Sequence, residues 1–79
     1  MTPVTMAEAV FASTLQPSDA PTPREVNVAI RTSLRRYHGS RGCTAVLAAE
    51  YGHDPVAAAA RMRWALALVA APTISSHAA

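Results

Sequence analysis

The sequence predicts an all-α fold, a compact bundle of three to four helices packed in an orthogonal or helix-turn-helix-like way. Signals that start and stop helices recur along the chain, apolar residues recur at helical spacing, and strand-like alternation is nearly absent. With 79 residues the chain has room for one domain, which we place at 1–71 and follow with a flexible tail at 72–79. The helices are expected at about 5–15, 23–38, 41–51 and 55–71.

The first helix is predicted from the spacing of two polar residues near the N-terminus. Thr5 and Glu8 are three positions apart, as in a capping box, and the helix that they open should run to Leu15. A loop is expected at 16–21, because two prolines and a Ser-Asp pair favour turns there.

The second helix has the clearest start. Thr22 can cap the free amides, Pro23 suits the first helical position, and Glu25 can complete a capping box. The apolar stripe of this helix consists of Val26, Ile30, Leu34 and Tyr37. Gly39 is then expected to supply a left-handed stop.

Two further helices follow on short loops. The third should lie between Ser40 as N-cap and Gly52 as C-cap. Its apolar arc consists of Cys43, Val46, Leu47 and Tyr51. The fourth opens with Asp54 as N-cap before a proline, and it should end at Ala71 because another proline follows.

Composition limits both the core and the compartment. Eighteen of the apolar residues are alanines, which bury little surface each, so the core is small. Cys43 is the only cysteine and no basic leader precedes the first helix, so we expect a cytoplasmic protein without a disulfide. The longest apolar run is interrupted by Arg61 and Arg63, which argues against a membrane span. All seven basic residues are arginines, and with the many alanines this suggests coding from a high-GC bacterium.

The last helix carries the first candidate site. At 100° per residue, one of its sides holds a methionine, a leucine and a valine, while Trp64 and Leu68 fall nearly opposite. A short chain can hardly enclose both sides, so we predict that Arg61, Trp64 and Leu68 bind a partner or a second copy of the chain. The alternative is that Trp64 is the central core aromatic and that the arginines extend from it to solvent.

The second candidate site is basic. Arg24, Arg31 and Arg35 project away from the apolar stripe of the second helix and form a basic ridge. Guanidinium groups bind phosphate or carboxylate, so this ridge could hold a nucleic-acid backbone or an acidic protein. The alternative is the solvated face of an amphipathic helix.

The junction of the third and fourth helices resembles the turn of the helix-turn-helix DNA-binding family. Leu47, Ala48 and Gly52 follow the apolar-Ala-x-x-x-Gly pattern of that family over about twenty residues. The resemblance implies contact with DNA through the helix that follows. The sequence departs from the family at Arg61, which stands where the family buries an apolar residue. The expected recognition helix also begins with alanines at 57–60, which cannot form bidentate contacts with bases.

Catalytic and metal-binding patterns are not found in the sequence. Four residues could ligate a metal, but none has paired ligand spacing: His38, Cys43, Glu50 and His53. No nucleophile, base and orienting group stand together, and no glycine-rich phosphate loop occurs. Glu50 falls on the apolar side of its helix, so it should either pair with Arg61 or Arg41 or, in the last turn, escape to solvent.

These observations predict a small non-catalytic interaction or regulatory module. It should bind a protein partner or itself through an apolar helix face, and it should need no cofactor, metal or small-molecule substrate. The alternative function is a small DNA-binding protein of helix-turn-helix-like geometry, with its arginines on the phosphate backbone.

Overall fold

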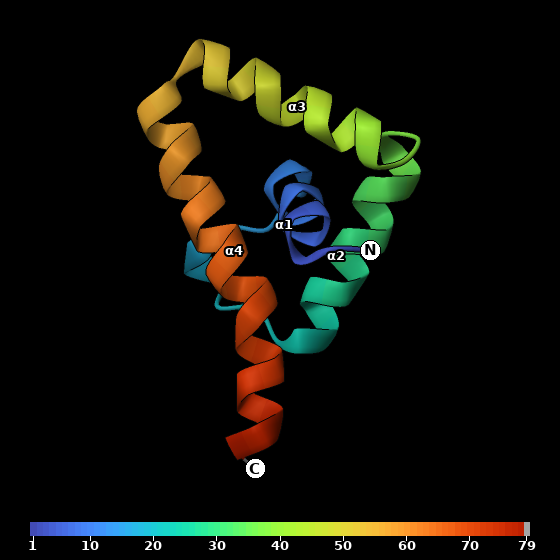
Figure 1. The fold of residues 1–79 in the computed structure, drawn as a ribbon, viewed down its shortest axis with the longest axis vertical. Coiled ribbons are helices and arrows are strands. Elements are labelled where there is room, and N and C mark those ends of the chain that lie inside the picture. Colours follow the sequence, from blue (N-terminus) through green and yellow to red (C-terminus); the bar gives the residue numbers. More distant parts are fainter. Residues whose placement is uncertain (79) are drawn as a thin grey trace.

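The computed structural model describes the backbone of residues 1–78 and the side chains of residues 1–70. Over that part of the chain it contains four α-helices and one short 3-10 helix (Figure 1). They are α1 (Pro3–Ala12), η1 (Pro17–Asp19), α2 (Pro23–Arg36), α3 (Ser40–His53) and α4 (Pro55–Ala78). The all-α prediction is therefore confirmed.

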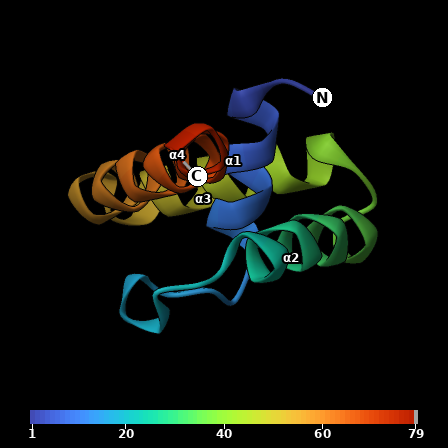
Figure 2. The same ribbon diagram turned by 90° about the horizontal axis from the view of Figure 1, so that it is seen from below.

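Helix α1 lies at the centre of the molecule, and the three longer helices surround it. Figure 1 looks almost along α1, with α2, α3 and α4 around it, and Figure 2 shows α1 running across the layer of α3 and α4 towards α2. Helix α1 contacts each of the other three. The buried residues of α1 are Ala7, Ala9, Val10 and Phe11. Because successive residues turn by about 100°, these side chains point to several sides, and α1 is enclosed almost all round.

The core forms around α1 and is made largely of small side chains. Its buried members are Ala7, Ala9, Val10, Val26, Ile30, Cys43 and Ala65. Half-buried side chains close it, among them Leu34, Trp64 and Leu68. The alanines allow α1 to approach its neighbours closely, which compensates in packing for the small number of large apolar residues.

Helix α1 begins and ends earlier than the sequence suggested. Its N-cap is Thr2, whose hydroxyl oxygen accepts a hydrogen bond from the amide of Thr5 at 3.1 Å. The predicted capping box of Thr5 with Glu8 is wrong, because Glu8 instead accepts a hydrogen bond from the hydroxyl of Thr44 at 2.9 Å. This contact joins α1 to α3, and such a tertiary partner could not be inferred from local spacing.

The predicted start of α2 is confirmed, whereas its stop differs in one residue. Glu25 accepts a hydrogen bond from the Thr22 amide at 2.8 Å, and its own amide donates to the Thr22 hydroxyl at 3.2 Å. Two residues after the helix have a positive φ, His38 at 61° and the predicted stop Gly39 at 106°, so the left-handed turn begins one residue earlier than expected. The amide of Gly39 donates to the carbonyl of Leu34 at 2.7 Å, which closes a Schellman motif one residue further on.

Helix α3 packs against the end of α2 through a glycine. A Cβ atom at Gly42 would lie 1.7 Å from the Tyr37 carbonyl oxygen, so a larger residue would push the two segments apart. The helix begins at Ser40 with Gly39 as N-cap, where Ser40 was expected as the cap, and it continues past Gly52 to His53. The start is shifted by one residue and the end by two, which are small differences at helix ends.

The fourth helix begins as predicted and continues further. Asp54 accepts a hydrogen bond from the amide of Ala57 at 3.1 Å, which confirms the N-cap. The backbone of α4 remains helical to Ala78 and does not end at Ala71. Proline removes one amide donor and strains one turn, and a helix can continue across that defect. The side chains from position 71 on, and residue 79 altogether, lie outside the described residues, so the flexibility expected for 72–79 stays a prediction.

Candidate protein-binding groove

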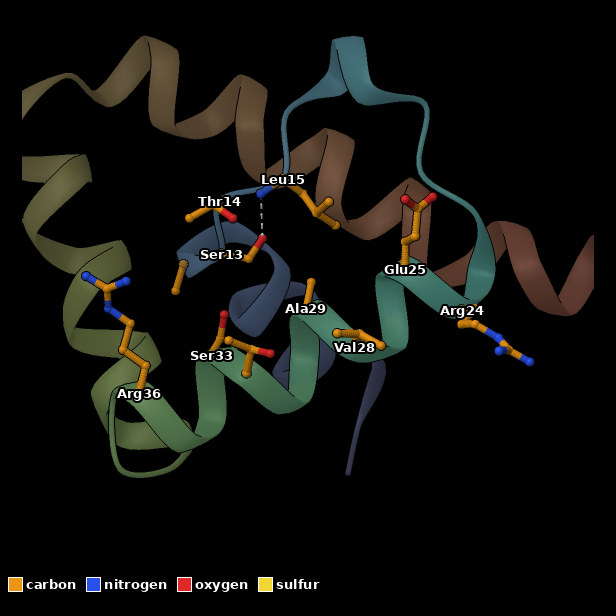
Figure 3. A pocket seen from close by; sticks show the side chains of 11 residues that line it. Ser13, Thr14, Leu15, Arg24, Glu25, Val28, Ala29, Ser33 and Arg36 are labelled. Carbon is orange, nitrogen blue, oxygen red and sulfur yellow. Dashed lines mark hydrogen bonds between the residues drawn. The ribbon is translucent and has the colours of Figure 1, made fainter.

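A groove of about 390 Å³ lies between the segment that follows α1 and one side of α2 (Figure 3). Its lining residues are Ala12, Ser13, Thr14, Leu15, Arg24, Glu25, Val28, Ala29, Thr32, Ser33 and Arg36. The apolar part of the groove comes from Leu15 on one wall and Val28 and Ala29 on the other. Val28 is 48% exposed although it is a large apolar residue. The groove is therefore an apolar hollow that the chain itself leaves open.

The groove follows from how α2 presents its sides. The stripe that includes Val26 and Ile30 is buried against the core. Val28 is two positions from either of them, which places it about 200° away on the helix, on the outward side. A valine there does not pack against the core, so its apolar surface stays in contact with water. A ligand that covered this surface would gain free energy from its burial.

An arginine stands at each end of the groove, and the Arg24 side chain points away from the hollow in Figure 3. Figure 3 places Arg24 near the start of α2 and Arg36 near its end, and both side chains are exposed. One carboxylate, that of Glu25, belongs to the lining, and it already accepts the hydrogen bond of the α2 capping box. The electrostatic character of the rim is therefore positive.

The basic ridge predicted from the sequence is present, and it adjoins the groove. Arg24, Arg31 and Arg35 are all exposed on α2. Val28 follows Arg24 by four positions and precedes Arg31 by three, so it stands in the same outward row. The ridge thus carries an apolar residue in its middle. A valine among arginines is a sequence signal that could have indicated this apolar surface; Val28 was missed in the sequence analysis, and the second wall of the groove could not be inferred at all.

The second wall of the groove is held from α4 by Arg61. Its Nε–H donates to the carbonyl of Phe11 at 2.9 Å. One terminal nitrogen donates to the carbonyls of Ser13 at 3.0 Å and Leu15 at 2.9 Å. These three carbonyls belong to the end of α1 and the segment after it, where helix hydrogen bonds are no longer available. Arg61 therefore substitutes for the missing turn of α1.

The Arg61 side chain is also packed between two rings. The carbon of its guanidinium lies 5.6 Å from the centre of the Phe11 ring and 4.9 Å from that of Trp64. Burial lowers the pKa of Arg61 from its ordinary value, and the charge of Glu50 opposes that shift. Glu50 itself is exposed, the outcome expected for a residue in the last turn, and it acts on Arg61 through its field.

The predicted partner-binding residues of α4 lie together, and they also face the molecule's own core. Trp64 and Leu68 are half-buried and pack against the core cluster, as do Met62 and Val69 from the side predicted to be opposite. The buried Ala65 lies between these two sets on the helix, so they flank one inward stripe. Leu66 is the exposed member, at 38%. Binding of a partner at Arg61, Trp64 and Leu68 remains a prediction.

The remaining candidates do not gather into a site. Cys43 is fully buried, and burial raises the pKa of its thiol, with a smaller contribution from the charge of Glu8. Among the described residues, no three potential metal ligands come together. Nor does any helix in that part of the chain combine the length and apolar character needed to cross a membrane.

Comparisons with protein family models, curated proteins and solved structures gave no match. The groove and the residues around it are therefore the features from which we propose a function.

Proposed function

We propose that this protein is a small interaction module that binds an acidic segment of a protein partner in the groove along α2. The observation that supports this most is the groove itself, an apolar hollow with arginines at both ends. Apolar side chains of the partner would enter between Leu15 and Val28. Carboxylates beside them would meet the guanidinium groups at the rim.

Charge complementarity favours an acidic occupant over a second copy of the chain. The chain has a formal net charge of +2, and four arginines are exposed along α2: Arg24, Arg31, Arg35 and Arg36. A second molecule docked through the same face would bring these arginines together, which is unfavourable. An amphipathic helix or extended segment with glutamates or aspartates next to its apolar residues matches both the hollow and the charge.

A protein segment also fits this surface better than DNA does. The first turns of α4, where a recognition helix would read bases, expose Val56 at 80% together with alanines at 57 and 60. These side chains have no hydrogen-bonding groups for base edges. A phosphate backbone could bind the basic ridge, but it would leave the apolar groove uncovered.

Binding of a designed peptide tests the proposal. The acidic probe peptide has about 15 residues, enough for a marginal helix, with leucines at every third or fourth position and glutamates and alanines between them. The basic control peptide carries lysine in place of every glutamate. We expect fluorescence anisotropy to show a dissociation constant on the order of 10 µM for the acidic peptide. The basic peptide should bind at least about tenfold more weakly.

The same measurement distinguishes nucleic acid from protein as the partner. A DNA duplex of about 20 base pairs is titrated beside the two peptides at low and at physiological salt. Binding of the acidic peptide that persists at physiological salt, with weaker binding of DNA, supports the proposal because apolar contacts are not screened. Tight DNA binding with no binding of the acidic peptide would contradict it.

A further inference from the structure

We infer that Arg61 is the positioning residue of the groove, and that it fixes the wall at Ser13–Leu15 from a helix outside the groove. The inference depends on the proposed function for its biological meaning. The geometry on which it stands is independent of any ligand. Arg61 does not line the groove, yet two of the carbonyls that it binds belong to residues that do.

The segment after α1 has few other supports. The amide of Leu15 donates to the hydroxyl oxygen of Ser13 at 3.2 Å, and the amide and hydroxyl of Ser13 both donate to the Val10 carbonyl. These local contacts bind Ser13 to the end of α1, and the backbone of Leu15 is linked to α1 through Ser13. The side chains at 16–20 are exposed, so the stretch beyond Leu15 buries little surface. The hydrogen bonds from Arg61 are the contacts that tie the backbone of this wall to α4.

The arginine is specifically suited to this task. The three carbonyls belong to every second residue of the chain, Phe11, Ser13 and Leu15, and they converge on one planar guanidinium. A planar group with several fixed donors can satisfy all three carbonyls at once, whereas a lysine ammonium is a compact point donor on a flexible stem. The rings of Phe11 and Trp64 hold the plane in place. A lysine at this position should keep the charge and lose the positioning.

Amide hydrogen exchange of R61K tests the inference without a ligand. Arg63 stands two positions along α4 and is exposed, so R63K is the matched control. We expect R61K to speed exchange at the amides of Leu15 and Gln16 by about tenfold or more, with little change at the α2 and α3 amides. R63K should match the wild type. Equal exchange in R61K and wild type would overturn the inference, as would a uniform rise over all helices, which indicates general destabilisation.

A wild-type measurement covers the case in which R61K does not fold. If Arg61 holds the wall, a single local opening exposes both the Nε–H proton of Arg61 and the amide proton of Leu15 to exchange with solvent. Their exchange should therefore respond in parallel to temperature and to low concentrations of denaturant. An Arg61 proton that stays protected while the Leu15 amide exchanges freely would show that the wall moves independently of Arg61.

Peptide binding then separates this inference from the proposed function. If Arg61 positions the wall, R61K should bind the acidic probe peptide at least about fivefold more weakly than R63K does, since part of the ordering must occur on binding. Equal affinities would count against the inference alone. Failure of the wild type to bind would count against the proposed function alone, because the exchange results would still decide the role of Arg61.

Discussion

Helices α2 and α4 both expose apolar residues, but only α2 does so in a hollow. Val28 on α2 faces a second wall made by Ser13–Leu15, with arginines at the ends (Figure 3). On α4, Leu66 and Val56 are exposed at 38% and 80% on an outer surface otherwise rich in alanine. A partner gains more from a concave apolar site, because its side chain is covered on several sides. Whether an apolar surface is concave therefore indicates a binding site better than how much apolar surface a helix exposes.

The same comparison explains why the long apolar helix α4 is not the helix that we propose for binding. The apolar residues of α4 seemed too widely spread around the helix to be buried on one face. In the structure its large residues flank a single stripe that packs on α1 and its neighbours. Arg61 on that stripe is used inside the molecule, and through Ser13 and Leu15 it supports the groove beside α2. The long helix thus contributes to the groove by holding one of its walls.

The largest expected effect comes from placing a charge in the hollow. V28E should weaken binding of the acidic probe peptide by about 30-fold or more, since burial of a valine is worth about 1.5–3 kcal/mol and the new carboxylate repels the ligand. L66E on α4 should leave the affinity within about twofold. Both positions are exposed, so circular dichroism should show both variants folded. Equal losses in the two variants would place the site elsewhere.

Charge reversal at the rim gives the next effect. R36E and R63E change the net charge of the protein by the same amount, so they differ only in where the charge lies. We expect a loss of about tenfold for R36E and about twofold for R63E at low salt, and a smaller difference at high salt. Anisotropy titrations at two ionic strengths measure this. A larger effect from R63E would favour the α4 surface.

Packing substitutions test the inner and outer sides of α4. Ala65 is fully buried, whereas Ala67 is exposed. A65L should lower the free energy of unfolding by about 1–3 kcal/mol, because the added carbons have no space. A67L should change it by less than about 0.5 kcal/mol. Urea unfolding followed by circular dichroism makes the measurement, and a costless A65L would mean that the inner side of α4 is open as well.

The smallest effect concerns pH. Burial raises the pKa of the Cys43 thiol, so above about pH 9 the unfolded chain loses a proton that the folded chain keeps. The stability should therefore fall as the pH rises through that range. The free energy of unfolding of C43A should fall less steeply over the same pH range. Identical pH dependence of the two proteins would show that the thiol is not shielded.

Much of the fold could be predicted because local chemistry determines it. The capping box of Thr22 with Glu25 and the cap at Asp54 are confirmed, since they depend on residues within one turn. The predicted box at Thr5 and Glu8 was wrong because Thr44, 36 positions away from Glu8, is the partner that Glu8 binds. The spacing of residues within one helical turn does not reveal contacts between residues that are far apart in the sequence.

The candidate site was predictable only in part for the same reason. The exposure of Arg24, Arg31 and Arg35 follows from helix periodicity, and the structure confirms it. The groove needs Leu15 to lie across from Val28, and that arrangement depends on Arg61, which is 46 positions from Leu15. Of the two arginines that line the groove, Arg24 was named from the sequence, and the tertiary structure was needed to show Arg36 and the hollow between them.

Methyl and amide NMR shifts of the full chain on titration with the acidic probe peptide test the central claim most directly. We expect the largest changes at Leu15, Val28 and Ala29, and the smallest at Leu66. Changes centred on Trp64 and Leu68, with the groove methyls unmoved, would contradict it and would place the binding surface on α4.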